Sequence, residues 1–234
     1  MDTQTPLYIR LASALAVFPG YLRVRELLLS HANDDDVCVV AGGAVRNVLL
    51  GRPIHDVDIF LSKRLLQKLL NHINQSEVHQ GPLGSPRWMI DTIHHIDLVP
   101  LEEFDQGFGR CSSVFDILDQ FDVTANAIAY DPRTNKVTDS KGGYADLQRR
   151  IMRAVRLDCP DQPMRANIAL TWRVDRWFRI AHYSGTLGLM IEPRTLSWLR
   201  ANRDCIRFRK HFSAIFFPPF VSSYIAGDDI PEAA

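Results

Sequence analysis

Two adjacent glycines between an apolar segment and a helical segment constrain the fold of this chain more than any other feature. Residues 37–40 are apolar, which is typical of a short buried strand, and Gly42 and Gly43 come directly after Ala41. Residues 45–50 then have the apolar spacing of a helix. Glycines at such a turn let backbone N–H groups approach a phosphate, although a plain strand-to-helix turn has the same sequence.

Three aspartates on predicted strands follow this unit. Residues 56–60 alternate polar and apolar, so Asp56 and Asp58 point to one face, about 7 Å apart at a rise of about 3.3 Å per residue. Two such carboxylates can share Mg²⁺, but on an isolated strand they can equally lie on a solvated face. Asp97 lies within the apolar segment 95–99, where an unpaired carboxylate is costly to bury. Beside a phosphate-binding turn, three strand carboxylates indicate metal-assisted phosphoryl transfer.

The remaining pattern is that of a mixed α/β chain. Helical spacing is expected in two further segments, 5–32 and 63–73. Strands are expected in four more, at 88–90, 95–99, 127–130 and 136–138, of which the last two flank a turn like a hairpin. Residues 101–120 are expected to form an irregular, mobile connection, and everything after about residue 144 has helical character.

These elements predict two domains. The first covers residues 1–148, with helices at 5–32 and a sheet at about 37–140. The second covers residues 149–234 and is helical, with a short C-terminal segment. We therefore expect an α+β fold in which a mixed sheet is flanked by helices and followed by a helical region.

Charge is divided unevenly along a chain that is neutral as a whole. Residues 149–211 contain 14 Lys and Arg against 5 Asp and Glu, whereas residues 1–148 contain 13 against 19. An acidic front suits a metal site and a basic back suits RNA, although a solvated helix face gives the same asymmetry. The aromatic residues among the arginines at 172–179 are most simply helix core, but they could also stack on single-stranded RNA.

Neither a membrane nor an oxidising compartment is indicated. Apolar runs are interrupted far short of the roughly 20 residues that cross a bilayer, and the first residues lack the basic start of a signal peptide. The four cysteines, at 38, 111, 159 and 205, have no close paired spacing. We expect a cytoplasmic protein with free thiols.

Three segments resemble motifs of the tRNA nucleotidyltransferase/poly(A) polymerase family, the bacterial-type branch of the polymerase-β-like nucleotidyltransferases. Residues 42–58, GGAVRNVLLGRPIHDVD, resemble its opening motif. Residues 121–130, FDVTANAIAY, and 139–147, DSKGGYADL, resemble two later motifs. The resemblance covers about residues 37–180 and implies a short member with the family's head and part of its neck.

The resemblance implies a mixed-sheet head that carries three carboxylates for two Mg²⁺ ions, followed by a helical neck that reads the incoming base. At matching positions the catalytic and metal-binding acids are Asp56, Asp58 and Asp97. The implied nucleotide-binding residues are Gly42, Gly43, Arg46, Asp122, Asn126, Gln162 and Arg165, the last two within a segment, 161–165, that is similar to the neck motif Glu-Asp-x-x-Arg.

Departures from the family pattern concern base reading. Asn47 replaces an acid, Gln162 replaces the base-reading acid, and Ile168 and Thr171 stand where arginines are usual. An amide offers both a donor and an acceptor, so it can pair with more than one base edge. We therefore expect relaxed selectivity, with ATP and CTP both used.

The implied activity is transfer of a nucleoside monophosphate from an NTP to an acceptor hydroxyl, with release of pyrophosphate. An RNA 3′ end is the preferred acceptor, and Asp97 would activate its hydroxyl. Two alternatives stay open at this stage. The acceptor could be a protein or a small molecule, or the chain could be a non-catalytic module that binds a nucleotide or RNA.

Overall fold

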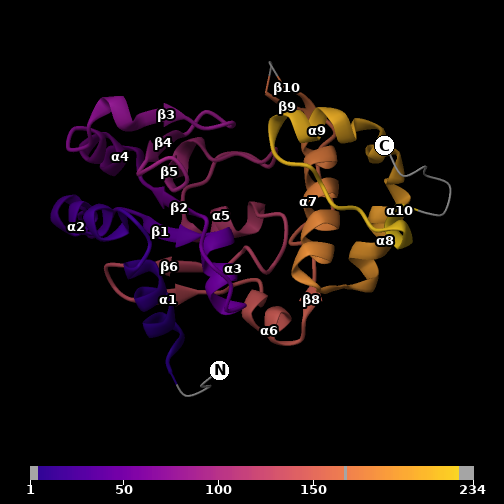
Figure 1. Cartoon of the computed structure of the whole chain (residues 1–234), viewed down its shortest axis with the longest axis horizontal. Coiled ribbons are helices and arrows are strands. Elements are labelled where there is room, and N and C mark those ends of the chain that lie inside the picture. The colour runs from indigo at the N-terminus through magenta and orange to yellow at the C-terminus, as the bar shows by residue number, and fades with distance from the viewer. Residues whose placement is uncertain (1–4, 166–167, 227–234) are drawn as a thin grey trace.

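A mixed seven-stranded sheet organises the computed structural model (Figure 1), which describes residues 5–165 and 168–226. The strand order is β3-β4-β5-β2-β1-β6-β7. The central pair β2 and β5 is parallel, whereas the other neighbours in the sheet are antiparallel. The predicted α+β fold with a mixed sheet is confirmed.

The elements follow the chain in mixed order. The sheet strands are β1 (Cys38–Ala41), β2 (Asp56–Leu61), β3 (Val78–Gln80), β4 (Pro86–Met89), β5 (His95–Pro100), β6 (Ala129–Asp131) and β7 (Lys136–Thr138). Two small pairs are added by β8 (Ile151–Met152), β9 (Pro163–Arg165), β10 (Ile168–Thr171) and β11 (Met190–Ile191). The α-helices are α1 (Leu7–Ala16), α2 (Tyr21–His31), α3 (Gly43–Leu49), α4 (Lys63–Leu70), α5 (Val114–Gln120), α6 (Gly143–Gln148), α7 (Trp172–Leu187), α8 (Pro193–Ala201), α9 (Arg209–Ile215) and α10 (Ser223–Ala226).

The two faces of the sheet have different covers. Because successive strand side chains point to opposite faces, Val57 and Ile59 of β2 join the apolar cluster that also holds leucines of α1, α2 and α4. Phe60, on the other face, joins a smaller cluster with Ile117 and Leu118 of α5. This second face also carries Asp58, two residues before Phe60 on β2.

The glycine turn after β1 has the structure that its sequence predicts. Gly42 has a φ of 82°, a left-handed conformation that favours glycine, and α3 begins at the next residue. A Cβ atom on Gly42 would lie 3.1 Å from Oδ2 of Asp58. The glycine therefore lets the chain turn directly against the buried acid.

Two predictions of secondary structure were wrong. Residues 101–120 contain α5, which begins at a reciprocal cap in which Ser113 and Asp116 satisfy each other's backbone N–H groups. Residues 151–165 and 168–171 are not helical. Pro160 and Pro163 lack the N–H that a helix interior requires and disfavour helical conformation in the residue before each. The long helix α7 begins only at Trp172.

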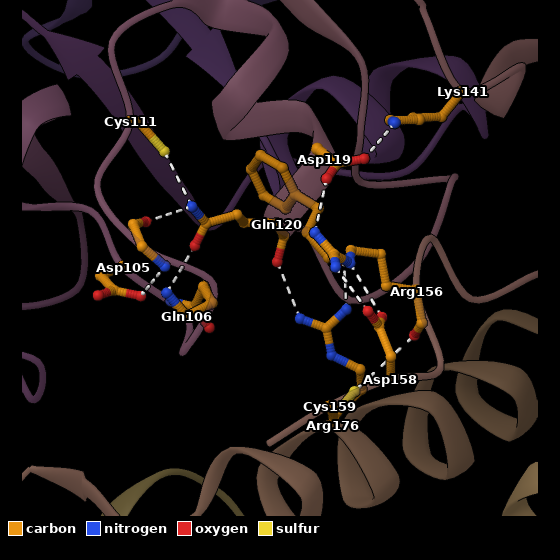
Figure 2. Close-up of polar contacts among 12 residues, drawn as sticks. Asp105, Gln106, Cys111, Asp119, Gln120, Lys141, Arg156, Asp158, Cys159 and Arg176 are labelled. Atoms are coloured by element: carbon orange, nitrogen blue, oxygen red, sulfur yellow. Dashed lines mark hydrogen bonds and ion pairs between the residues drawn. The ribbon is translucent and has the colours of Figure 1, made fainter. Parts of the chain in front are cut away.

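A polar network joins α7 to the connection before α5 (Figure 2). Arg176 donates hydrogen bonds to the backbone carbonyls of Gln120 and Phe121, at 2.9 and 2.7 Å. The Gln120 side chain accepts from the N–H of Gln106 at 2.7 Å and donates to Cys111 Sγ at 3.3 Å.

The predicted division of the chain into two domains at residue 148 stays a prediction, since one apolar cluster contains residues from both sides of that boundary.

The described helices were also compared with the length of a membrane span. Within residues 5–165 and 168–226, no single helix has both the length and the apolarity to cross a bilayer. Among the described residues, α1 and α2 together have the required length and apolar composition, but the two helices are bent by 115° at their junction.

Gly143 offers a test of the fold at the start of α6. A Cβ on Gly143 would lie 2.0 Å from the carbonyl oxygen of Thr124, a backbone atom that cannot rotate away. We expect Gly143→Ala to lower the free energy of unfolding by about 3 kcal/mol through this overlap. Urea denaturation measures the loss.

Gly142→Ala is the matched control. Nothing lies within 4 Å of a Cβ there, so only the left-handed backbone, with a φ of 74°, opposes the substitution. Its expected cost is about 1 kcal/mol. Equal losses for the two variants would contradict the packing described around Gly143.

Candidate active site

A cavity of about 500 Å³ opens between the acid-bearing face of the sheet and α7. Nine of the ten residues singled out in the sequence line it: Gly42, Gly43, Arg46, Asp56, Asp58, Asp97, Asp122, Asn126 and Arg165. Pockets of this size suit a small-molecule ligand. The structure thus brings together segments that lie more than 100 residues apart in the chain.

The three aspartates lie on adjacent parallel strands. Asp58 is the register partner of Asp97, and Asp56 is the register partner of His95, so all four side chains point to the same face. Burial raises the pKa of Asp58 well above its usual range, and the nearby carboxylates of Asp56 and Asp97 raise it further. An ionised Asp58 therefore requires positive charge beside it.

Asp97 already has a cationic partner. Arg87, its register partner on β4, donates from Nε to Oδ1 at 2.7 Å and from Nη2 to Oδ2 at 2.8 Å. This hydrogen-bonded fork raises the pKa of Arg87, so the guanidinium stays charged. His95 Nε2 is buried without a hydrogen-bond partner, 3.9 Å from Asp97 and 4.0 Å from Asp56.

The sequence implies two Mg²⁺ ions, and the carboxylate oxygens in the cavity decide how many of them fit. Asp56 and Asp58 are hard oxygen donors on one face, and Mg²⁺ is usually held by one or two carboxylates together with water and substrate phosphates. One ion therefore fits these two acids. Asp97 fits less well as a third ligand, because its carboxylate already accepts two hydrogen bonds from Arg87, whose positive charge would lie beside the ion. In the described part of the chain, no three His, Cys, Asp or Glu side chains converge on a metal position.

Arg46 is held in place from three directions. Its Nη1 donates to Asn126 Oδ1 at 2.8 Å, and its Nε and Nη2 donate to Asn47 Oδ1 at 3.1 and 3.0 Å. The guanidinium lies 4.7 Å from the centre of the Tyr183 ring. Asn47, which departs from the family pattern, thus orients the predicted phosphate-binding arginine.

Asp122 and Asn126 hold the Arg46 side chain in its orientation through two successive hydrogen bonds. Asp122 Oδ1 accepts from Asn126 Nδ2 at 2.7 Å, which fixes the amide so that its oxygen faces Arg46. The carbonyl of Asn126 accepts from the N–H of Gly42 at 3.1 Å. That N–H is therefore occupied, and the glycine turn offers fewer free donors than the sequence predicted.

Helix α7 supplies a wall that the sequence analysis treated as helix core. Asp175 and Arg179 form an ion pair with both oxygens 2.9 Å from Nε, and both residues line the cavity with Arg176 and Tyr183. Burial raises the pKa of Asp175, and Arg179 opposes that rise. The spacing of arginines at 173, 176 and 179 was the available signal.

The two predicted base-reading residues are separated. Arg165 lies on β9 and lines the cavity, whereas Gln162 is exposed and is not among the lining residues. The segment 161–165 is not part of the neck helix, contrary to the motif reading. A role of Gln162 in base selection stays a prediction.

The sequence of the chain was compared with those of known proteins and families. Residues 17–150, more than half of the chain, match the family described as Gabija anti-defense 2 (Gad2) family protein. The CCA-adding enzyme of Streptococcus mutans is 32% identical in an alignment of 203 residues that covers 79% of this chain and 48% of that enzyme. That of Streptococcus suis is 30% identical over 198 residues, covering 75% and 45%. The chain spans about half the length of these curated relatives.

Solved structures confirm the fold. A CCA-adding enzyme with ATP superposes with a TM-score of 0.64 at 19% identity, covering 86% of this chain and 48% of that one. A CCA-adding enzyme with CTP gives a TM-score of 0.61 at 19% identity, covering 90% and 48%. The predicted resemblance to tRNA nucleotidyltransferases is thereby confirmed.

The raised pKa of Asp58 leads to a testable prediction about stability. The raised pKa of Asp58 means that its neutral form stabilises the fold below about pH 4, the usual range of an unfolded aspartate. This stabilisation is lost as the pH rises through the folded-state pKa. Asp58→Asn removes that loss, so we expect its melting temperature to exceed wild type at pH 7 by at least about 2 °C, the shift from roughly 1 kcal/mol.

Thermal melts between pH 4 and 8 check the sign. The advantage of Asp58→Asn should grow with pH until the wild-type carboxyl is ionised. Asp56→Asn, at a side chain that is 48% exposed, should give a smaller gain. A variant less stable than wild type at every pH would show that Asp58 is stabilising when charged.

Proposed function

Because the chain belongs to the Gabija anti-defense 2 (Gad2) family and brings its acids and arginines into one cavity, we propose that it is a nucleotidyltransferase. It would transfer a nucleoside monophosphate from an NTP to an acceptor hydroxyl and release pyrophosphate. The observation that carries this proposal is the placement of Asp56 and Asp58 beside Arg46, within a cavity of nucleotide size. Two neighbouring carboxylates beside a guanidinium that is held in place suit a bound triphosphate and its divalent ion.

Each residue would act on the nucleotide through a group already fixed in place. Arg46 is oriented by Asn126 and Asn47 and would bind triphosphate oxygens. Asp122 would position Asn126, and hence Arg46, without touching the phosphates. Arg179, whose guanidinium lowers the pKa of Asp58, would help to keep that carboxylate ionised.

Asp56 and Asp58 would hold the divalent ion. Bound there, Mg²⁺ supplies Lewis-acid chemistry, lowering the pKa of the attacking hydroxyl and neutralising charge on the pyrophosphate. Water is partly excluded on the sheet side, because Asp58 and the aromatic residues Phe60 and Phe121 line the same cavity. A lower dielectric there strengthens every charge interaction with the substrate.

RNA is the first candidate acceptor. The curated relatives are CCA-adding enzymes, and one similar structure is a tRNA nucleotidyltransferase complexed with a primer tRNA and an incoming ATP analog. Residues 149–211 carry the excess of arginine and lysine that a phosphate backbone attracts. With ATP or CTP as donor, the product would be an extended RNA 3′ end.

The family description favours a second acceptor. An anti-defence protein would act against a component of the Gabija defence, and nucleotide transfer to a protein hydroxyl is a modification that the same site can perform. The chemistry at the NTP would be unchanged. Only the acceptor and the surface that binds it would differ.

Labelled nucleotides test the activity and the acceptor together. Purified protein would be incubated with each α-³²P-NTP, Mg²⁺ and either total RNA or a cell extract, and products separated before and after nuclease or protease treatment. We expect label in a macromolecule with wild type and only background with Asp58→Asn, which loses a charged ligand of the ion.

Asp34→Asn serves as the control, because Asp34 is an exposed carboxylate ahead of β1. It should transfer label at the wild-type rate. Nuclease-sensitive product supports RNA, and protease-sensitive product supports a protein acceptor. Equal labelling by wild type and Asp58→Asn would refute the proposed catalytic site.

Arg46→Ala tests the triphosphate site. It should weaken ATP binding by about 1.5–3 kcal/mol, the range for hydrogen bonds to charged groups, and leave adenosine binding nearly unchanged. Calorimetry compares the two ligands. Arg52→Ala, at an exposed arginine that donates to the carbonyl of Thr186, should alter neither affinity. Equal loss for ATP and adenosine would make Arg46 a structural residue.

A further inference from the structure

Arg87 is a group at the acid site whose position the sequence motifs do not anticipate. It lies on β4, directly opposite Asp97 in the antiparallel pair β4–β5. The side chains of Arg87 and Asp97 are 27% and 13% exposed, so the pair is largely shielded from water. Two parallel hydrogen bonds of 2.7 and 2.8 Å fix both groups in one plane.

The two hydrogen bonds from Arg87 limit how well Asp97 can bind a metal ion. Each Asp97 oxygen accepts one hydrogen bond from Arg87, so each has one of its lone pairs occupied. A divalent ion at Asp97 would also lie close to the guanidinium, and like charges repel strongly where water is scarce. Arg87 cannot relieve this by deprotonation, because guanidinium groups keep their charge in proteins.

The charge of Arg87 reaches beyond Asp97. Asp97 lies between Arg87 and Asp58 in the register of three adjacent strands, and Arg87 lines the same cavity as Asp56 and Asp58. Arg87 therefore already neutralises part of the charge that the three carboxylates create. A second cation has less to gain here than at a site with three unpaired acids.

We propose that Arg87 stands in place of one of the two expected ions, so that the site binds a single divalent ion through Asp56 and Asp58. This inference rests on the proposed function, because it concerns the same acid site. Asp97 is then a positioning residue that holds Arg87 against the site, and it is neither a metal ligand nor the group that activates the acceptor.

Counting bound Mn²⁺ tests this directly and needs no turnover. Wild-type protein saturated with a non-hydrolysable α,β-methylene ATP would be titrated with Mn²⁺ and followed by electron paramagnetic resonance. We expect one bound ion per chain, with no spin coupling between ions. Arg87→Met frees Asp97 and removes the positive charge, so it should bind two ions whose signal is broadened by their proximity.

Two further variants keep the test decisive. Arg23→Met removes an equivalent arginine, which lies 5.0 Å over the ring of Trp88, the next residue along β4, and should still bind one ion. Asp97→Asn should also bind one ion with an affinity within about threefold of wild type, because Asp97 is not a ligand. This variant retains a readout if Arg87→Met does not fold.

Each contrary outcome has a distinct meaning. Two ions in the wild type would overturn the inference and leave the proposed function standing. A single ion in both the wild type and Arg87→Met would also overturn it, since Arg87 would not be what limits the count. A tenfold or greater loss of affinity in Asp97→Asn would make Asp97 a ligand. No bound ion in any variant would overturn the proposed function as well.

Discussion

Burial of Asp58 among other carboxylates is the constraint on which the arrangement of this molecule depends. Its pKa is raised by loss of water and by Asp56 and Asp97, so an ionised site needs cations from elsewhere in the fold. Arg87 on β4 and Arg179 on α7 both lower that pKa. The sheet order, with β5 between β2 and β4, brings Arg87 to the acids, and the packing of α7 across the cavity brings Arg179. Both arrangements place positive charge near Asp58.

Helix α7 performs its part through arginines spaced three residues apart. Each step turns the side chain by about 60° around the helix axis, so successive arginines face different neighbours. Arg173 contacts Asp161 and Asn202. Arg176 donates to the carbonyls of Gln120 and Phe121, directly before Asp122. Arg179 pairs with Asp175 inside the cavity. One helix thus closes the cavity and fastens the two halves of the chain together.

Local patterns predicted the acids but not their partners. Alternation along β2 sufficed to place Asp56 and Asp58 on one face, because that depends only on strand geometry. The pairing of Arg87 with Asp97 depends on the register of β4 against β5, which the alternation of residues along either strand does not set. The segment 161–165 contains a strand and no helix, because Pro163 disfavours a helix interior, and the residue types of the motif do not determine where its side chains lie.

One wall of the cavity lies within the residues that match the family, and the other lies beyond them. The acids, the glycine turn and Arg46 all lie within residues 17–150, whereas α7 and Arg165 lie beyond them. Specificity is a difference between affinities for competing ligands, so a wall that meets the ligand can alter it without changing the chemistry at the acids. Arg165, Asp175 and Arg179 lie on that second wall. Under the proposed function, the transfer chemistry would depend on the acids with Arg87 and Arg179, and acceptor choice could change through Arg165 while those groups stay in place.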